Sequence, residues 1–367
     1  MVPLGTHLAH PVAVTRPPEP RPPRCATVLI CTFNRSAMLR ETLESLARMD
    51  DVAGGWDVLV VDNNSTDGTR DVVASLAGSF PVTLRYLSEP RQGKSHALNT
   101  GIAATPSDII AFTDDDVVVE KRWLAEAIKP LVARSDVDYT GGPVRAIWGT
   151  TPPSWLPTTN SNLWGTIAAL DYGEEPFIFE ERRWIPIGAN MAVRRSVFAR
   201  AGVFNPSLGR IGNSLLGQEQ SEFFYRTRHL GIRGLYVPEM ELHHHVPAAR
   251  LTRRYFRRWW YWKGISRARL HTIHPETELG LDLRNVRRIK GVPRFALGEV
   301  FGRVRKLCTS VLRRDHLRIA EEEMMLMYSV GYVLESWRTK KTPASATSDE
   351  RTGGRDSPQA RGAQPQP

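Results

Sequence analysis

Residues Ile109 to Asp116 read Ile-Ile-Ala-Phe-Thr-Asp-Asp-Asp, a short apolar run that ends in three carboxylates. Such a run predicts a buried strand, and open α/β sheets bind their ligands at the carboxyl ends of strands. Adjacent carboxylates repel one another unless a cation lies among them. Oxygen ligands with no cysteine nearby favour hard ions, so we predict Mg²⁺ or Mn²⁺ at this strand end. The competing interpretation is a solvated acidic turn before a helix.

The sequence around this run alternates between strand and helix patterns. Apolar runs predict strands at Ala26–Thr32, Trp56–Asp62, Val82–Ser88 and Ile109–Thr113. Apolar residues three or four positions apart predict helices at Ala37–Arg48, Asp67–Leu76, Ser95–Ala104 and Arg122–Arg134. Such alternation is typical of a mostly parallel sheet with helices on both faces. We therefore predict an α/β fold for this part of the chain.

The pattern becomes irregular after Val144. The stretch from Trp148 to Trp184 predicts a long functional or mobile loop. Further elements are predicted as a helix at Glu219–Leu230, a strand at Gly234–Val237, and amphipathic helices at Leu251–Leu270 and Phe295–Trp337. The predicted organisation is a disordered Pro-rich N-terminus (1–24), an α/β domain (25–248), a basic helical extension (249–340) and a disordered tail (341–367).

Composition limits the class of protein. A chain of 367 residues with 41% hydrophobic residues can bury a full core. Cys25, Cys31 and Cys308 are too few and too scattered for a disulfide framework or a zinc site, which favours a reducing compartment. No apolar run is long enough for a membrane span or a signal peptide. We therefore expect a cytoplasmic protein, or one bound peripherally to the inner face of the cell membrane.

The net charge of +10 is concentrated in one region. Residues 250–318 hold nineteen Lys/Arg and five Asp/Glu, so the rest of the chain is slightly acidic. Within this region, Arg250 to Lys263 interleaves arginines with aromatic residues, a pattern typical of a segment that lies on an anionic membrane surface. The alternative is a helix that packs its tryptophans on the catalytic domain. No RNA or DNA motif occurs, so no specific nucleic-acid partner is expected.

Polar side chains follow each of the first three predicted strands. The first strand is followed by Asn34 and Arg35, and the second ends in Asp62 with Asn63, Asn64 and Ser65 behind it. These ends meet at one edge of a doubly wound sheet, where Asp62 is placed to bind a base or ribose. The asparagines and Ser65 are equally typical of turns and helix caps. The third strand precedes Arg91-Gln-Gly-Lys94, a loop suited to a phosphate at a helix N-terminus.

Together these motifs resemble the bacterial-type family-2 glycosyltransferases, nucleotide-sugar enzymes of the GT-A (Rossmann-like) fold, over roughly residues 26–247. The resemblance implies a metal-binding Asp-x-Asp at Asp114 and Asp116, with His244 completing the metal shell. It implies an acceptor-side segment around Gly188 and Asn190. The implied nucleotide-sugar contacts are Thr32, Asn34, Arg35, Asp62, Asn64, Lys94, Asp114 and Asp115.

One position departs from the family pattern. Relatives commonly carry Glu-Asp where this chain has Glu219-Gln220, and the Asp is their usual general base. An amide cannot accept a proton at neutral pH, so Glu219, or Glu222 in second place, is the predicted base, with Gln220 on the acceptor side. Glu222 and Arg226 are four residues apart on a helix and could instead form an ion pair.

The implied reaction transfers a sugar from a nucleoside diphosphate to a hydroxyl of a glycan or lipid-linked acceptor, with inversion at the anomeric carbon. Asp116 belongs to the catalytic set because it holds the metal. Three alternatives are open: a haloacid-dehalogenase-like phosphatase with Asp114 as nucleophile, a membrane- or nucleic-acid-binding protein, and a transferase that binds without turnover. The phosphatase motif belongs on a first strand, whereas three strand–helix units precede Asp114 here.

Overall fold

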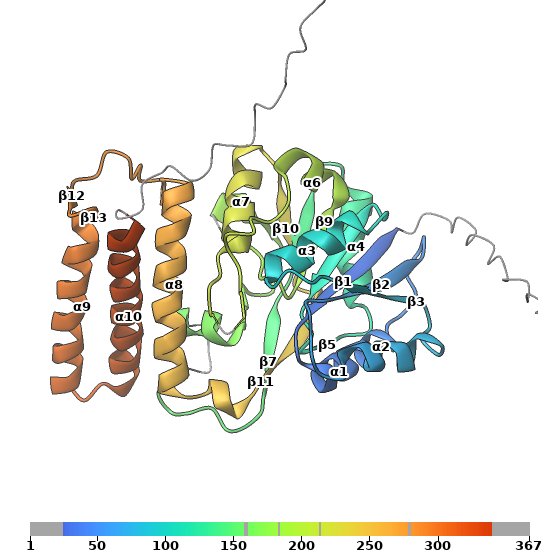
Figure 1. The fold of residues 1–367 in the computed structure, drawn as a ribbon, viewed down its shortest axis with the longest axis horizontal. Helices are drawn as coiled ribbons and strands as arrows, with labels where there is room; N and C mark the ends of the chain where they lie inside the picture. The colour runs from blue at the N-terminus through green and yellow to red at the C-terminus, as the bar shows by residue number, and fades with distance from the viewer. Residues whose placement is uncertain (1–24, 158–160, 183, 213, 278–279, 340–367) are drawn as a thin grey trace, which may run out of the picture.

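The computed structural model describes residues 25–157, 161–182, 184–212, 214–277 and 280–339. The terminal segments for which the sequence predicts disorder lie outside these residues. Figure 1 shows an α/β unit beside three long helices, which are α8 (Arg253–Ile273), α9 (Arg294–Leu312) and α10 (His316–Thr339).

The centre of the α/β unit is a sheet with the strand order β3-β2-β1-β4-β9-β6-β10-β8. The first four strands in this order are parallel, whereas β9 is antiparallel to both its neighbours and β8 is antiparallel to β10. Its strands are β1 (Ala26–Thr32), β2 (Trp56–Asp62), β3 (Thr83–Ser88), β4 (Ile109–Thr113), β6 (Tyr139–Gly141), β8 (Phe177–Ile178), β9 (Met191–Arg194) and β10 (Gly234–Tyr236).

Helices cover both faces of this sheet, which explains why its inner strands are apolar throughout. Successive residues of β1 enter opposite cores: Val28 and Ile30 pack in one cluster and Leu29 in the other. The first cluster contains α1 (Ser36–Leu46), α2 (Thr69–Ala77) and α4 (Trp123–Ala133). The second contains α3 (Lys94–Ala103), α6 (Arg195–Ala201) and α7 (Glu219–His229).

A smaller sheet lies beside the large one, with the order β5-β11-β7. It consists of β5 (Val117–Val119), β7 (Val144–Trp148) and β11 (Leu242–Val246). His244 on β11 pairs with Val117, directly after the acidic run. The small sheet therefore brings a distant histidine to the end of β4. The remaining elements are η1 (Asn162–Ile167), α5 (Phe179–Arg182), η2 (Ala248–Arg250), β12 (Arg288–Ile289) and β13 (Val292–Pro293).

The mostly parallel sheet and the bounds of β1, β2 and β4 are confirmed. The loop predicted from Trp148 to Trp184 contains short elements, η1, β8 and α5. The antiparallel insertion of β9 between β4 and β6 was not predicted, because a four-residue strand carries little periodicity. The stretch Phe295–Trp337 is helical as predicted, but it forms two helices that separate between Leu312 and His316, where Arg314 has a φ of 55°.

Two glycines allow α8 and α10 to approach closely. A Cβ on Gly264 would lie 2.0 Å from the Tyr328 carbonyl oxygen, and one on Gly331 would lie 2.1 Å from that of Tyr261. Both distances are impossible for carbon and oxygen, and both neighbours are backbone atoms, which cannot rotate away. The close packing of α8 against α10 therefore requires glycine at positions 264 and 331, because any Cβ would overlap the neighbouring backbone.

Gly264→Ala is expected to lower the melting temperature, since the helices must separate, with a loss of roughly 1–3 kcal/mol typical of overpacking. The matched control is Gly302→Ala on α9, where a Cβ meets nothing within 4 Å. The control should melt at the wild-type temperature or above it, because alanine favours helix. Calorimetry on both variants tests this. Equal melting temperatures for the two variants would show that the close contact is absent.

Candidate active site

The acidic run lies at the carboxyl end of β4, in the middle of the large sheet. Because β1 pairs in parallel with both β2 and β4, the ends of the three strands reach the same edge. Thr32 Oγ1, at the end of β1, donates a 2.7 Å hydrogen bond to Asp115 Oδ2. The strand ends that the sequence predicted to meet are therefore in contact.

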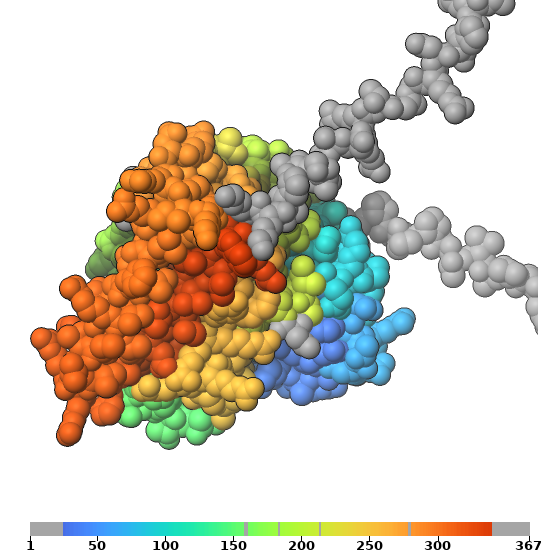
Figure 2. All heavy atoms as spheres, turned by 60° about the vertical axis from the view of Figure 1, so that its left-hand side comes forward, coloured from blue at the N-terminus to red at the C-terminus, as the bar shows by residue number. Residues whose placement is uncertain are grey.

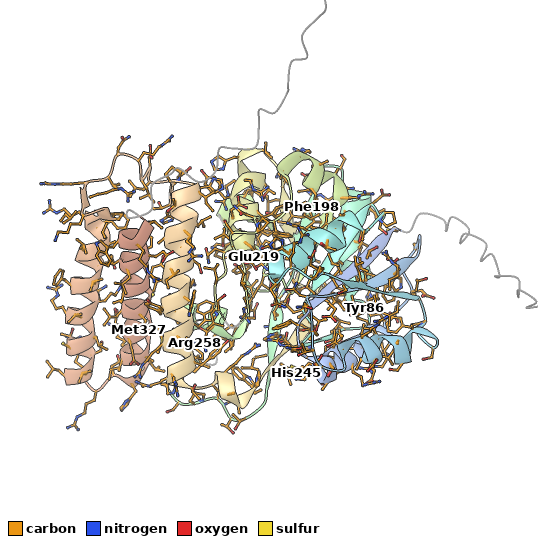
Figure 3. All side chains as sticks on the ribbon, in the orientation of Figure 1. Tyr86, Phe198, Glu219, His245, Arg258 and Met327 are labelled. Carbon is orange, nitrogen blue, oxygen red and sulfur yellow. The ribbon has the colours of Figure 1, made fainter. Side chains whose placement is uncertain are left out.

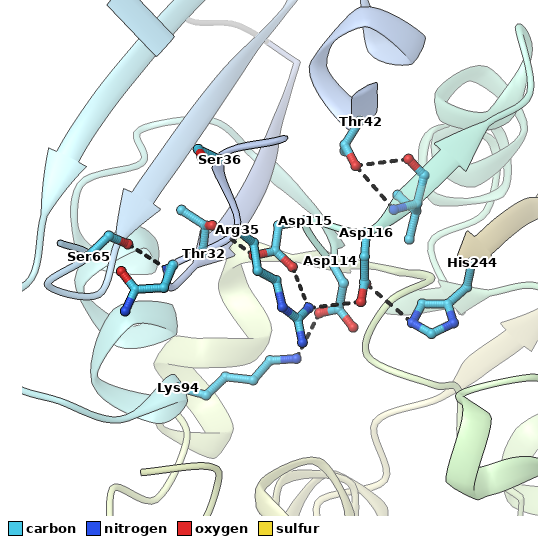
Figure 4. Close-up of polar contacts among 12 residues, drawn as sticks. Thr32, Arg35, Ser36, Thr42, Ser65, Lys94, Asp114, Asp115, Asp116 and His244 are labelled. Carbon is cyan, nitrogen blue, oxygen red and sulfur yellow. Dashed lines mark hydrogen bonds and ion pairs between the residues drawn. The ribbon is translucent and has the colours of Figure 1, made fainter. Parts of the chain in front are cut away.

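Side-chain cations surround the three carboxylates (Figure 4). One nitrogen of Arg35, Nη1, lies 2.8 Å from Asp115 Oδ1 and 2.8 Å from Asp116 Oδ2. Lys94 Nζ lies 2.7 Å from Asp114 Oδ1, and Arg250 Nη2 lies 3.4 Å from Asp116 Oδ2. These cations come from the β1–α1 loop, α3 and η2, so the acidic run holds distant parts of the chain together.

Burial and neighbouring charges shift the pKa values of the three carboxyl groups in different directions. Burial raises the pKa of Asp115 above its usual value and exceeds the lowering effect of Arg35. For Asp116 burial also opposes ionisation, but His244, Arg35 and Arg250 together hold its pKa below the usual range. Lys94 likewise holds the pKa of Asp114 below its usual value despite burial. Asp114 and Asp116 thus keep their negative charge, as a metal ligand must.

His244 lies beside Asp116, with Nε2 3.2 Å from Asp116 Oδ1. The other ring nitrogen, His244 Nδ1, is buried and has no hydrogen-bond partner, which is rare for a buried polar atom. Carboxylate oxygens and an imidazole nitrogen fit a divalent cation such as Mn²⁺.

The described residues nevertheless contain no group of three or more such side chains already arranged to hold an ion. Arg35, Lys94 and Arg250 hold the carboxylates in this arrangement. Binding of a metal here therefore requires Asp114 or Asp116 to exchange a side-chain cation for the ion.

The predicted nucleotide-binding residues fall into two groups. Some of them line one cavity of about 370 Å³ at this sheet edge, and these are Thr32, Arg35, Lys94, Asp114 and Asp115. The other three, Asn34, Asp62 and Asn64, are not among its lining residues.

Asn34 and Asp62 are used within the protein. The side-chain oxygen of Asn34 accepts a hydrogen bond from Thr66 N at 2.7 Å. The two oxygens of Asp62 accept from Ser65 N at 2.8 Å and from the Tyr86 hydroxyl at 2.7 Å. Asn64 is exposed and has a left-handed φ of 64°. These residues therefore stabilise turns, which is one of the two predicted roles. If Asp62 also bound a base or ribose, its carboxylate would have to keep or exchange its hydrogen bonds with Ser65 and Tyr86.

Helix α7 brings Glu219 to the cavity, whereas Glu222 points elsewhere. Glu219 is the first residue of the helix, is buried and lines the cavity; Figure 3 shows it between the large sheet and α8. Glu222 lies 2.8 Å from Arg226 Nε and 2.9 Å from His274 Nε2 and does not line the cavity. The predicted alternative for Glu222, an ion pair with Arg226, is therefore present, and a hydrogen bond with His274 also occupies its carboxylate, so its use as a base is not supported.

The residues predicted to lie on the acceptor side also fall into two groups, one at the cavity and one buried in the core. Gln220 lines the cavity, and its Oε1 accepts a 3.1 Å hydrogen bond from Gly188 N. A Cβ at position 188 would lie 1.6 Å from Gln220 Nε2, so Gly188 is needed for this contact. Asn190 is fully buried, donates to the Pro143 and Met240 carbonyls and accepts from Trp123 Nε1. Asn190 does not line the cavity, and these bonds make it a structural cross-link.

Several lining residues were not predicted as site residues, namely Arg210, Arg250, Trp259, Lys263 and Ser266. Three of them belong to α8, which the loop before α7 contacts through a 3.0 Å hydrogen bond from Gly217 N to Ser266 Oγ. Their sequence carries no ligand-binding motif. The only available signal was the mixture of basic and aromatic residues, which we interpreted as a membrane segment.

The segment Arg250–Lys263 packs within the protein. Phe256 and Trp260 are buried in a cluster with Met324 of α10. Arg257 Nε lies 2.6 Å from Glu323 Oε1, also on α10. These contacts use the apolar side chains that an interfacial helix would insert into lipid. The membrane prediction for 250–263 is therefore not supported, and the alternative of tryptophans packed on the protein holds.

Lys263 is enclosed by aromatic rings. Its Nζ lies 4.5 Å from the ring centre of Trp260 and 5.1 Å from that of Trp259. Burial, and after it the charge of Arg267, lower the pKa of Lys263 to about 8. The cavity therefore has a cation on its α8 wall that is costly to keep charged.

Comparison with known proteins agrees with this geometry. Residues 27–202, just under half of the chain, match the family model described as glycosyl transferase family 2. The succinoglycan biosynthesis protein ExoM of Rhizobium meliloti is 29% identical over 60% of this chain and 67% of its own length. A glucosyl-dolichyl phosphate glucuronosyltransferase of Haloferax volcanii is 22% identical over 68% of this chain and 78% of its own. The phosphatase alternative is not favoured by these matches.

The fold also matches a solved enzyme. The mannosyltransferase PcManGT from Pyrobaculum calidifontis, solved in complex with GDP-Man and Mn²⁺, superposes with a TM-score of 0.58. The match covers 89% of this chain and 90% of the other at 19% identity, so it extends beyond the α/β unit. At this identity the likeness establishes the fold alone.

Replacing Lys263 by Met is expected to stabilise the protein in a pH-dependent way. The lowered pKa means that the folded protein carries a penalty for the charged ammonium; the penalty is complete below about pH 8 and declines towards the unfolded value of 10.5. Urea unfolding should therefore show Lys263→Met more stable than wild type at pH 7, with a smaller difference at pH 10. The control is Lys121→Met at an exposed position. A difference that is constant between the two pH values would contradict the enclosed ammonium.

Proposed function

We propose that this chain, a glycosyltransferase whose residues 27–202 match glycosyl transferase family 2, uses this cavity to transfer a sugar from a nucleoside diphosphate to an acceptor hydroxyl. The observation that carries the proposal is the convergence of Asp114, Asp116, His244 and Lys94 on one cavity that also contains Glu219. Carboxylates for a metal, a cation for phosphate and a separate carboxylate for a proton are what this reaction needs.

Phosphate binding is assigned to the acidic run and its neighbouring cations. A divalent ion, Mn²⁺ or Mg²⁺, held by Asp114, Asp116 and His244 would neutralise the charge of the leaving diphosphate. The Mn²⁺ in the complex of the Pyrobaculum enzyme supports this choice. Lys94 and Arg210 line the cavity and would contact phosphate oxygens. Although burial opposes it, the charges of Asp114 and then Glu219 raise the pKa of Lys94 above its usual value, so it stays charged for this role.

Glu219 is proposed as the general base. As the acceptor oxygen bonds to the anomeric carbon, the Glu219 carboxylate takes the hydroxyl proton, and the bond from that carbon to the diphosphate oxygen breaks with its electron pair. Attack from the face opposite the leaving group inverts the configuration. Glu219 lies on α7 and the acidic run lies at the end of β4, so the base and the phosphate site come from different elements. Gln220 positions the base indirectly by fixing α7 to Gly188.

The acceptor is proposed to be a glycan or a lipid-linked sugar that enters along α8. Trp259 and Lys263 line this side of the cavity, and tryptophan rings offer apolar faces with a polar edge, which suits sugars. Two relatives are named for succinoglycan biosynthesis and for transfer to a glucosyl-dolichyl phosphate, which supports this class of acceptor.

Glu219→Gln is expected to reduce kcat about 10²- to 10⁴-fold, the usual contribution of a general base. The melting temperature and donor binding should change little, since the amide has the same shape. Glu222→Gln is the matched control on the same helix. It should lower the melting temperature, because the ion pair with Arg226 and the hydrogen bond with His274 are weakened, and it should affect kcat far less. If the two variants exchange these phenotypes, Glu219 is not the base.

Asp116→Asn is expected to abolish metal-dependent nucleotide binding. A thermal-shift panel of nucleoside diphosphates with Mn²⁺, or with EDTA instead, should show a metal-dependent stabilisation by at least one nucleotide. This increment should disappear in Asp116→Asn and persist in Asp136→Asn, an exposed carboxylate used as the control. Stabilisation of equal size in EDTA would contradict the metal assignment and leave the fold assignment intact.

A further inference from the structure

Helix α9 is covered by the protein along only a small part of its surface. Of its nineteen residues only Ala296 and Ser310 are buried. Figure 1 shows α9 at the outer edge of the molecule, farthest from the α/β unit, and Figure 2 shows the same helical region at the surface. The helix therefore presents most of its side chains to the surroundings.

Apolar side chains on this helix form one exposed stripe. Phe301, Val304, Cys308, Val311 and Leu312 are separated by steps of three or four residues with one adjacent pair, which places them on one face of a helix. Phe301 is 76% exposed and Leu312 is 82% exposed. Large apolar side chains this accessible and this regularly spaced are typical of an interaction surface.

Basic residues flank the stripe. The exposed ones between positions 294 and 318 are Arg294, Arg305, Lys306, Arg313, Arg314 and Arg318. The same stretch contains two acidic residues, and each is paired within it, Glu299 with Arg303 and Asp315 with Arg318. The surface around the apolar stripe is therefore strongly positive.

We propose that α9 and the turn that joins it to α10 form a docking surface for an anionic lipid bilayer. The apolar stripe enters the boundary between headgroups and acyl chains, and the flanking arginines and Lys306 contact lipid phosphates. Among the described residues, no helix has the length and hydrophobicity of a membrane span. This surface goes beyond the proposed function, because sugar transfer does not require it.

A second copy of the chain is a less suitable occupant. A symmetric contact through α9 would bring two strongly basic surfaces together, and like charges at short range oppose association. Anionic lipid supplies both the apolar layer and the opposite charge. The helices also connect this surface to the cavity: α9 and α8 both pack on α10, and α8 forms a cavity wall. Bilayer docking would thus hold the α8 wall near membrane-borne acceptors.

The test is flotation of the full-length protein with phosphatidylcholine vesicles, with and without phosphatidylglycerol. The wild type should float with the anionic vesicles and weakly with the neutral ones, and high salt should release it. The double variant Phe301→Ser/Leu312→Ser should lose at least about tenfold in partitioning. Val132→Ser on α4 is the matched control, because this valine is 69% exposed and belongs to another face of the molecule.

Charge is tested separately with Arg305→Glu/Lys306→Glu, which should weaken binding to anionic vesicles and leave the weak binding to neutral ones unchanged. The proposal would be overturned if the wild type floated equally with and without phosphatidylglycerol, or if Phe301→Ser/Leu312→Ser floated to the same extent as the wild type. Sedimentation equilibrium tests whether a second copy of the chain binds the stripe. A wild-type dimer that becomes monomeric in Phe301→Ser/Leu312→Ser would show that the stripe is a dimer interface instead. No donor sugar is used, so these results are independent of the proposed reaction.

Discussion

Three adjacent carboxylates at the end of one strand, of which Asp115 and Asp116 are buried and Asp114 is partly exposed, are the constraint on which the site depends. Asp114, Asp115 and Asp116 would repel one another strongly in a buried environment if nothing opposed their charge. Arg35, Lys94 and Arg250 oppose it, and each comes from a different part of the chain. The resulting ion pairs hold the β1–α1 loop, α3 and η2 around one cavity. Any cation that enters the cavity competes with these ion pairs.

The topology of the two sheets explains how these groups come within reach of one another. Parallel pairing of β1 with β2 and β4 brings their carboxyl ends to one edge. The small sheet then pairs β11 with the strand that follows the acidic run, so that His244 lies beside Asp116. Alternation along β11 points His244 inward, whereas His243 and His245 are partly exposed. The choice among three adjacent histidines is therefore made by strand geometry.

The sequence predicts the parts of this structure whose signal is local. The strands β1, β2 and β4 are continuous apolar runs, and the acidic run is visible because it directly follows one of them. Short elements escape prediction: β9 has four residues and inserts antiparallel by contacts with strands distant in the sequence. Helical spacing predicted the ion pair of Glu222 with Arg226. The hydrogen bond between His274 and Glu222 and the cross-link from Asn190 to Met240 could not be predicted, because they depend on residues far along the chain.

The basic aromatic segment shows why composition alone cannot distinguish a cavity wall from a membrane surface. Both can use aromatic rings and long cationic side chains, and Arg250–Lys263 and α9 each have such residues. The two segments differ in the contacts that they make with the rest of the chain. Glu323 and Met324 of α10 face α8 and take up its charge and its apolar side chains. On α9, Arg303 pairs with Glu322 of α10, but among the described residues no buried cluster contains Phe301 or Leu312. The helical extension thus uses similar sequences for two purposes, with α8 closed over the cavity and α9 left open to a partner outside the protein.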